Sequence, residues 1–263
     1  MEQYAERIHL QFSGRVERAA PGLSVRPETF PLLTTRVHVP PVPLNLVARP
    51  QLISTLDRGI RQRKLTLLLA PAGSGKTTLL SAWRAAPAGN SLPAAWLSLD
   101  ERDNEPGHFL AYLLLALQGI QGTDEFQRCA PDASSEPLSE QALIRLLNAI
   151  AASIAYDFVL VLDNYQVIAH PAIHRALAFV LQYAPRSMHL VIASRLQPPF
   201  PLIRLRAQGQ LWEMTGQDLR FDAEEAALFL NTSMGLQLAR HAVEELHQQS
   251  EGWITGLQLA ACT

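Results

Sequence analysis

Short runs of almost purely apolar residues recur along this chain, and segments with helical spacing separate them. The clearest runs are Leu65 to Leu69, Phe158 to Leu162 and His189 to Ala193. Strands of such composition are buried on both faces, which is typical of parallel sheets. Their alternation with helices predicts an α/β fold in which helices cover both faces of a parallel sheet.

The remaining elements follow from the same periodicity. Two further strands are predicted at Ala94–Leu99 and Leu211–Met214. Apolar residues at helical spacing predict helices near 51–62, 77–86, 107–118, 139–153 and 172–183. A chain of 263 residues is long enough for one large domain or two smaller ones.

The strongest functional signal is the segment Ala70-Pro-Ala-Gly-Ser-Gly-Lys-Thr77, which follows the first strand directly and opens a helix. It matches the phosphate-loop pattern, with Ala70 where glycine is usual. In such loops backbone N–H groups and a helix N-terminus surround the phosphates, and the lysine reaches the β- and γ-phosphates. The predicted contacts to the nucleotide are Ala72, Gly73, Ser74, Gly75, Lys76, Thr77 and Thr78.

A second acidic position completes the predicted site. Asp163 ends the strand that begins at Phe158, at the carboxyl edge where ligands of α/β sheets gather. Carboxylate and hydroxyl oxygens suit Mg²⁺, so we expect Asp163 and Thr77 to hold the metal of a bound nucleotide. Lys76, Asp163, Asn164 and Arg195 form the predicted catalytic set.

Two members of that set carry specific expectations. Asn164 stands where many ATP-hydrolysing enzymes have a carboxylate, and its amide accepts no proton at neutral pH. We therefore predict slow or impaired hydrolysis, with Asn164 limited to positioning water. Arg195 follows the strand that ends at Ala193, and we expect it to approach the γ-phosphate from a neighbouring strand.

The predicted domain organisation has three parts. Residues 1–33 read as a flexible N-terminal extension or a loosely attached helix near Tyr4–Phe12, and residues 34–216 as a P-loop nucleotide-binding domain. Residues 217–263 read as a small helical domain, whose first helix is capped by Asp222 with Glu225 as its capping-box partner. Because the chain ends on an apolar helix, we expect this domain to be incomplete.

Several segments resemble, in the same order, the ATPase domain of the MalT-like large ATP-binding regulators of the LuxR family. These regulators belong to the signal-transduction ATPases with numerous domains (STAND). The segments with the resemblance are Leu46–Pro50, Ala70–Trp83, Trp96–Asn104, Phe158–His170 with Ser194-Arg195, Leu205–Leu211, Asp218–Phe221 and Glu251–Trp253. The resemblance spans about residues 34–263.

This resemblance implies a nucleotide-operated switch. ADP would hold a resting form, and ATP together with an inducer would drive self-association, while inducer sensing and DNA binding would lie in later domains. Val47, Ala48 and Arg49 would contact the adenine side of the nucleotide, with Arg49 near the phosphates. Two positions depart from the family pattern: the acidic pair reads Asp163-Asn164, and the Gly-x-Pro signature reads Gly252-Trp-Ile254.

Composition excludes other classes of function. Lys and Arg number 22 against 24 Asp and Glu, so we expect no direct DNA contact from this segment. Cys129 and Cys262 are far apart, which favours a reduced, cytoplasmic protein. The longest apolar run, Phe109 to Leu117, is about half of the ~20 residues that a membrane span needs, so we expect no membrane contact.

Two alternatives remain at the level of sequence. A small-molecule or nucleotide kinase needs an arginine-bearing lid, for which the segment Ile203–Gln210 with Arg204 and Arg206 is the candidate. An interaction scaffold with a vestigial nucleotide site is the other alternative, and the intact Gly75-Lys-Thr77 argues against it. We interpret the basic run Arg61-Gln-Arg-Lys64 as a solvated helix end.

Overall fold

The computed structural model describes residues 32–121, 129 and 136–261. The chain divides into two units, residues 1–31 and residues 32–263, and all described residues belong to the second. The helix expected near Tyr4–Phe12 lies outside the described residues. The three-part domain organisation, with its boundary between residues 216 and 217, stays a prediction.

One parallel sheet organises the described part of the chain. Its five strands lie in the order β2-β3-β4-β1-β5, which confirms the predicted fold class. The strands are β1 (Leu65–Leu69), β2 (Ala94–Ser98), β3 (Phe158–Asp163), β4 (Met188–Ser194) and β5 (Leu211–Thr215). Since β4 lies between β1 and β3, the phosphate-loop strand and the Asp163 strand are separated by the strand that leads to Arg195.

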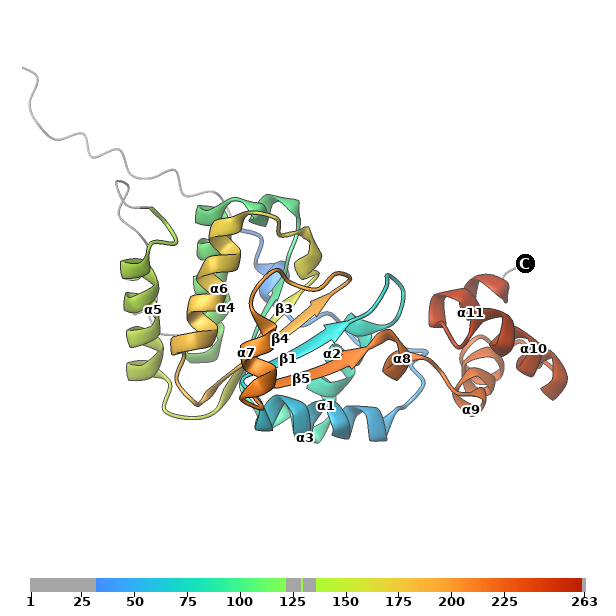
Figure 1. Cartoon of the computed structure of the whole chain (residues 1–263). Coiled ribbons are helices and arrows are strands. Elements are labelled where there is room, and N and C mark those ends of the chain that lie inside the picture. Colours follow the sequence, from blue (N-terminus) through green and yellow to red (C-terminus); the bar gives the residue numbers. More distant parts are fainter. Residues whose placement is uncertain (1–31, 122–128, 130–135, 262–263) are drawn as a thin grey trace, which may run out of the picture. The chain divides into compact units, whose positions relative to one another are not determined.

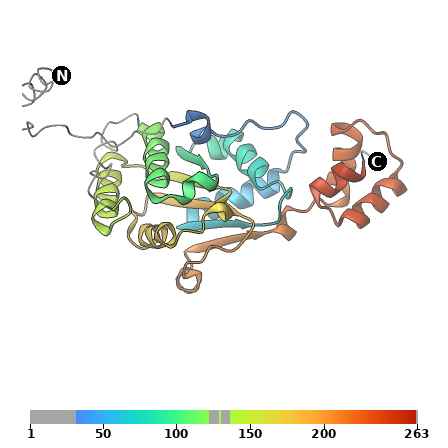
Figure 2. The same cartoon turned by 90° about the horizontal axis from the view of Figure 1, so that it is seen from above.

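Helices cover both faces of this sheet (Figures 1 and 2). One face carries α1 (Pro50–Gln62), α2 (Lys76–Ala85) and α3 (Pro87–Asn90), and the other carries α4 (Pro106–Gln121), α5 (Glu140–Ser153) and α6 (Pro171–Tyr183). Short helices α7 (Leu202–Ala207) and α8 (Gly216–Leu219) flank β5, and 3₁₀ turns occupy Thr34–Val37, Glu101–Asn104 and Tyr165–Val167. Sequence periodicity missed these turns, α3 and α8, because one turn contains too few residues to show a period.

The strand residues alternate between two cores. In β3, Phe158, Leu160 and Leu162 pack with α4, α5 and α6, whereas Val159 and Val161 pack with α1 and α2. Both faces of the strand are therefore buried, which explains its uninterrupted apolar sequence.

The C-terminal segment forms a third, separate core. Its helices are α9 (Ala223–Ala227), α10 (Arg240–Ser250) and α11 (Ile254–Ala260), and its buried centre includes Val47, Phe221, Phe229, Leu230 and Leu257. Figure 1 shows these helices beyond the carboxyl ends of the strands. Among the described residues, none of the helices combines the length and apolar character that crossing a membrane requires.

The start of α9 is built as expected, and its end differs. The N–H of Glu225 donates to the Asp222 carboxylate at 2.8 Å, and the N–H of Asp222 donates to Glu225 at 3.1 Å. The helix predicted to begin at Asp222 widens after Ala227 into a π-helical turn, Leu228–Ser233. The side-chain amide of Asn231 bonds both backbone groups of Leu238, which turns the chain away from a regular helix.

Candidate functional site

The loop between β1 and α2 is shaped by two glycines. Gly73 and Gly75 have φ angles of 69° and 82°, in the left-handed region that side chains disfavour. A Cβ atom on Gly73 would lie 2.2 Å from the hydroxyl oxygen of Thr255, so glycine is also needed for the close approach of α11. The loop leads directly into α2, with Gly75 as the residue before the helix. The unpaired N–H groups at the N-terminus of α2 favour an anion.

Lys76 places a buried cation in this loop. Its side chain is the first of α2, the residue is 7% exposed, and Nζ donates to the carbonyl oxygens of Ala70 at 2.7 Å and Pro71 at 2.8 Å. Burial lowers the pKa of Lys76, nearby Arg195 lowers it further, and Asp163 opposes the shift. An anionic group is the partner that would best stabilise this ammonium, so the loop fits a phosphate.

Thr77 and Asp163 meet across the sheet edge. The Thr77 hydroxyl donates to Asp163 Oδ2 at 2.7 Å, and the N–H of Asn164 donates to Oδ1 at 3.0 Å. Asp163 is 2% exposed, and burial raises its pKa, while both hydrogen bonds and the charge of Lys76 act in the opposite direction. A hydroxyl and a carboxylate within reach of one position are hard oxygen ligands that fit Mg²⁺.

Asn164 and Arg195 flank this pair. Asn164 adopts a left-handed conformation with φ of 61°, which Asn and Asp tolerate better than most residues. The N–H of Arg195 donates to the Gln166 side chain at 3.2 Å, and its charge lies close enough to Lys76 to lower the lysine pKa. The structure therefore gathers Lys76, Thr77, Asp163, Asn164 and Arg195 at one edge of the sheet.

A cavity of about 320 Å³ opens beside the loop. Val47, Gly75, Thr78, Phe221 and Ile254 are among the residues that line it. Its walls come from the segment before α1, the first turns of α2 and the C-terminal helices. These walls are mostly apolar and lie next to the phosphate loop, so the cavity suits the planar nucleobase of a nucleotide. Ala48 is exposed and does not line this cavity.

Comparison with known proteins identifies relatives by sequence. No family model matches the chain. Over 224 residues, the chain is 35% identical to the HTH-type transcriptional regulator MalT of Yersinia enterocolitica and 36% identical to MalT of Serratia proteamaculans. Each match covers 82% of this chain. The chain belongs to the MalT-like regulators. It spans about a quarter of their length, since each match covers 24% of the relative.

Solved structures agree on the fold of this MalT-like chain. A STAND protein with a tetratricopeptide repeat sensor from Pyrococcus horikoshii superposes with a TM-score of 0.59 at 15% identity, covering 86% of this chain and 31% of that one. A Walker-type ATPase of Pyrococcus abyssi gives a TM-score of 0.52 at 16% identity, covering 84% and 68%. Both likenesses show the P-loop NTPase fold.

Arg49 of the MalT-like chain lines the cavity beside the phosphate loop, and its guanidinium is bonded to the segment around the start of α9. Its guanidinium donates to Glu225 at 2.8 Å and to the carbonyl oxygens of Leu219 at 2.8 Å and Arg220 at 2.7 Å. It also lies over the ring of Phe221, 5.3 Å from the centroid. The structure therefore uses Arg49 to tie the start of α1 to the connection before α9, a partnership that spans about 170 residues and leaves no local sequence signal.

Two contacts to the phosphate loop of the MalT-like chain were not predicted from the sequence. Trp253 Nε1 donates to the carbonyl oxygen of Ala72 at 3.2 Å, and the Thr255 hydroxyl donates to the carbonyl oxygen of Gly73 at 3.0 Å. The start of α11 thus lies directly on the phosphate loop. The motif at Gly252 pointed to this segment, but Thr255 lies outside the motif.

Polar contacts also brace the loops next to Asp163. The buried Asp103 carboxylate accepts from Arg36 and lies 3.1 Å from His108 Nδ1. Its neighbour Asn104 accepts from the N–H groups of Ala169 at 2.8 Å and His170 at 2.7 Å. The Asn104 bonds join the loop after β2 to the loop after β3, whereas the Asp103 contacts join it to the turn at Thr34–Val37 and to α4.

The lid expected for a kinase lies elsewhere. Arg206 on α7 pairs with Glu213 at 2.6 Å, and Arg204 lines a different cavity together with Lys64, which precedes β1. That cavity is at the amino edge of the sheet, away from the phosphate loop. The observed placement of α7 therefore gives the kinase alternative no support.

Proposed function

We propose that this MalT-like chain is an ATP- and ADP-binding switch module of a transcriptional regulator, with slow or impaired ATP hydrolysis. The observation that carries the proposal is the buried Lys76 ammonium, held by two neutral carbonyl oxygens inside a loop with two left-handed glycines. The Thr77–Asp163 contact beside it supplies the oxygen ligands that a nucleotide-bound Mg²⁺ needs.

Different residues would bind different parts of the nucleotide. Backbone N–H groups from Ala72 to Thr78 and the Lys76 ammonium would bind the phosphates, and Thr77 and Asp163 would hold Mg²⁺. The cavity beside Val47 would take the adenine. Arg195 would meet the γ-phosphate from the strand end between β1 and β3.

Slow hydrolysis follows from the residue after Asp163. Efficient attack of water on a γ-phosphate benefits from a group that orients the water and takes its proton. Asn164 offers an amide, which orients water without accepting a proton. The module would therefore persist in its ATP state long enough to act as a signal.

The contact between α11 and the loop supports a switch. The carbonyl groups of Ala72 and Gly73 bond Trp253 and Thr255, so binding at the loop and docking of α11 involve the same peptide units. Two processes that share one element are thermodynamically coupled, and the coupling is reciprocal. We propose that this contact passes the nucleotide state to further regulator domains and to self-association, in the cytoplasm, without DNA contact by this segment.

A thermal-shift measurement tests nucleotide binding. Ligand at 100 times its dissociation constant stabilises the folded state by roughly 2.7 kcal/mol, which raises the Tm of a chain of this size by about 5–10 °C. We expect this rise with Mg·ADP or Mg·ATP, and a clearly smaller rise in the Lys76→Ala variant at the same nucleotide concentration. The absence of a shift in the unmodified chain with either nucleotide would favour the scaffold with a vestigial site.

A further inference from the structure

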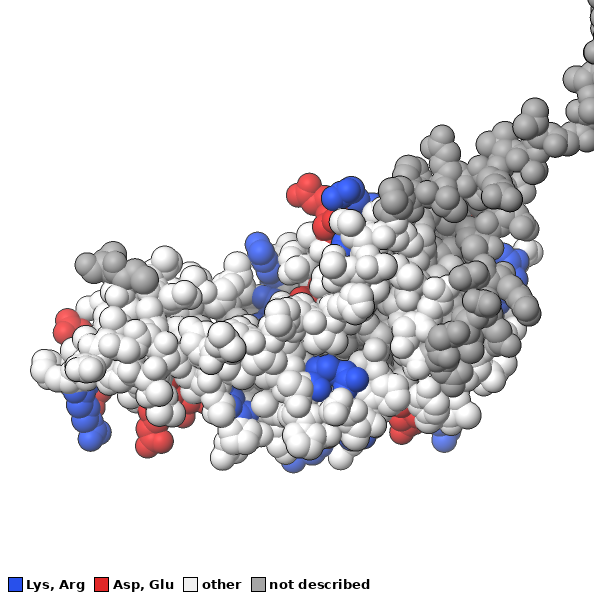
Figure 3. Space-filling model, turned by 180° about the vertical axis from the view of Figure 1, so that it is seen from behind, with Lys and Arg blue, Asp and Glu red and all other residues white. Residues whose placement is uncertain are grey.

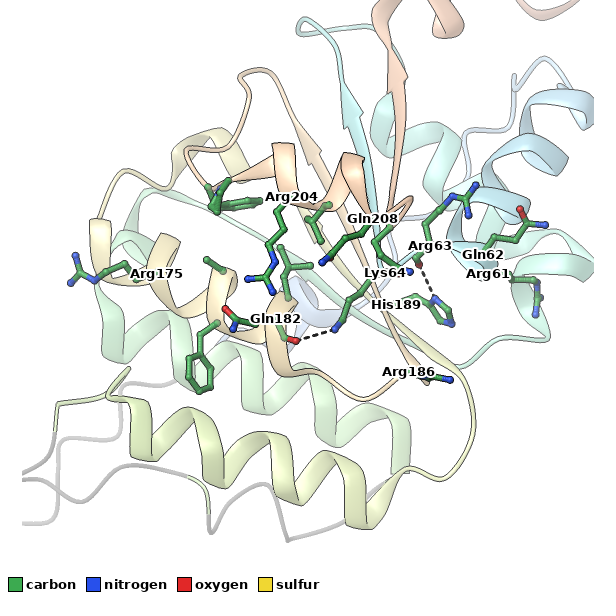
Figure 4. A pocket seen from close by; sticks show the side chains of 17 residues that line it. Arg61, Gln62, Arg63, Lys64, Arg175, Gln182, Arg186, His189, Arg204 and Gln208 are labelled. Atoms are coloured by element: carbon green, nitrogen blue, oxygen red, sulfur yellow. Dashed lines mark hydrogen bonds between the residues drawn. The ribbon is translucent and has the colours of Figure 1, made fainter.

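A second cavity, of about 840 Å³, lies where the strands of the sheet begin. Lys64 and Gln210 directly precede β1 and β5, and His189 lies at the start of β4. The end of α6, with Gln182, and the short helix α7, with Arg204, complete the walls (Figure 4). The cavity is therefore at the opposite edge of the sheet from the phosphate loop.

The charged side chains that line this cavity are of one sign. Among the described residues, its lining contains no Asp or Glu, and six lining residues are cationic: Arg61, Arg63, Lys64, Arg175, Arg186 and Arg204. Arg61 pairs with Asp57 at 2.9 Å. The ion pairs within the described part of the chain involve none of the other five.

This concentration contrasts with the molecular face drawn in Figure 3, where charged side chains of both signs are few and scattered. Cations that lie close together without carboxylates repel each other. They make the local electrostatic potential positive, which attracts anions. The basic run from Arg61 to Lys64, expected as a solvated helix end, thus lines a concave site.

Two of the cations point to the same space. Figure 4 shows Arg204 of α7 and Lys64 converging beside Gln182, whereas Arg61 and Arg175 lie at the two ends of the cavity. Lys64 Nζ has one long hydrogen bond, at 3.4 Å, to the carbonyl oxygen of Gln182. His189 Nδ1 donates to the carbonyl oxygen of Arg63 at 3.0 Å and so fixes the chain where it enters β1.

We propose that this cavity binds a small phosphate-bearing molecule, held between Arg204 and Lys64. A phosphate group has three acceptor oxygens and a charge of about −1.5 to −2, so it bonds a guanidinium and an ammonium at once. Pockets for small molecules have volumes of about 300–1,000 Å³, a range that includes this cavity. The rim arginines would attract the anion, and Gln182 and Gln208 add polar groups near it.

The lysine content of the chain gives a direct test. Lys64 and Lys76 are the only lysines in the sequence, and each reports one site. Inorganic pyrophosphate is the probe, and acetic anhydride acetylation read by mass spectrometry is the measurement on the unmodified chain. We expect pyrophosphate to protect Lys64, and we expect the same protection of Lys64 in the Lys76→Ala variant, in which the phosphate loop is weakened.

Calorimetry of pyrophosphate binding to the Lys76→Ala chain adds an affinity. Adding Arg204→Gln is expected to weaken binding about tenfold, because charge-assisted hydrogen bonds are lost. Adding Arg206→Gln is the matched control on the same helix, since Arg206 already pairs with Glu213 outside the cavity, and it is expected to leave the affinity unchanged. Melting temperatures of both variants verify that they fold.

Three results would overturn the proposal. One is acetylation of Lys64 at the same rate with and without pyrophosphate. Another is equal loss of affinity in the Arg204→Gln and Arg206→Gln chains, which would indicate attraction by overall charge. The third is citrate binding as tightly as pyrophosphate, which would reject the assignment to phosphate.

Discussion

The two lysines of this chain lie at opposite ends of the same strand, and their surroundings differ. Lys76 follows β1, is 7% exposed, and is surrounded by backbone carbonyl oxygens, with Asp163 nearby. Lys64 precedes β1, is half-buried, and lies among arginines from α6, α7 and the loop before β4. One cation belongs to a site made by the backbone and the other to a site made by side chains.

The difference teaches how each site is specified. At the carboxyl edge, two glycines and one helix N-terminus set the geometry, so eight consecutive residues suffice. At the amino edge, Lys64 lies more than one hundred residues before Gln182 and Arg204 in the chain, and only the strand order brings the three together. The first kind of site is visible as a motif, whereas the second is visible only in three dimensions.

The largest effect we expect is on catalysis at the carboxyl edge. Asn164→Asp places a proton acceptor beside Asp163, and Asp also tolerates the left-handed backbone at this position. We predict that phosphate release from ATP accelerates by about 100-fold, the lower range for general base catalysis. Asn164→Ala is the control and should not accelerate release. Several turnovers per second in the unmodified chain would refute the role given to Asn164.

Replacing each lysine by alanine in turn tests whether the two edges of the sheet act separately. Lys76→Ala removes the ammonium from the phosphate loop and is expected to weaken Mg·ADP binding by about 10- to 100-fold, since hydrogen bonds to charged groups contribute about 1.5–3 kcal/mol. Lys64→Ala removes the other lysine and is expected to leave the affinity for Mg·ADP unchanged. Isothermal titration with both variants measures the contrast. Similar losses in the two variants would show that the edges do not act separately.

A smaller effect is expected from the hydroxyl that docks α11. The Thr255 hydroxyl restrains the Gly73 peptide from outside the loop, so Thr255→Val should loosen the loop. We predict Mg·ADP binding weaker by about 2- to 10-fold, the range for one hydrogen bond. Thr255→Ser retains the hydroxyl and should bind as the unmodified chain does. If Val and Ser variants bind equally, the contact plays no part in nucleotide affinity.

Asp163 should show an opposition between stability and function. Burial raises its pKa above the ordinary value of 3.8, so its ionised form disfavours the folded state in the absence of metal. Asp163→Asn removes the charge and leaves an oxygen to accept from Thr77. We predict a higher Tm near pH 7 in metal-free buffer, by about 2–4 °C for each kcal/mol recovered, together with loss of the Mg²⁺ dependence of ADP binding.

The pH dependence of that gain has a defined sign. A raised pKa in the folded state means that the unmodified chain loses stability as pH rises from 3.8 through the folded value. The advantage of Asp163→Asn should therefore be complete at neutral pH and shrink as pH falls toward 3.8, where the carboxyl becomes protonated in both states. An advantage that grows on acidification would contradict the burial argument.

Much of the fold was predictable because local patterns are strong where both sides of a strand are buried. The runs at Leu65, Phe158 and His189 placed three strands within one residue of their observed bounds. Asp222 and Glu225 predicted the start of α9, because a capping box needs only residues that are three apart in the sequence. The π-helical turn after Ala227 was not predictable, because it depends on Asn231 bonding Leu238.

The sequence by itself determined the alternating α/β pattern, the phosphate loop and the presence of Asp163 at a strand end, since each depends on residues that are neighbours in the chain. Only the tertiary structure decided that Arg49 bonds Glu225, that Thr255 lies on Gly73, and that the basic run before β1 faces Arg204. These contacts join segments that lie far apart in the sequence. Strand order and helix packing set such distances, and no local pattern of residues encodes them.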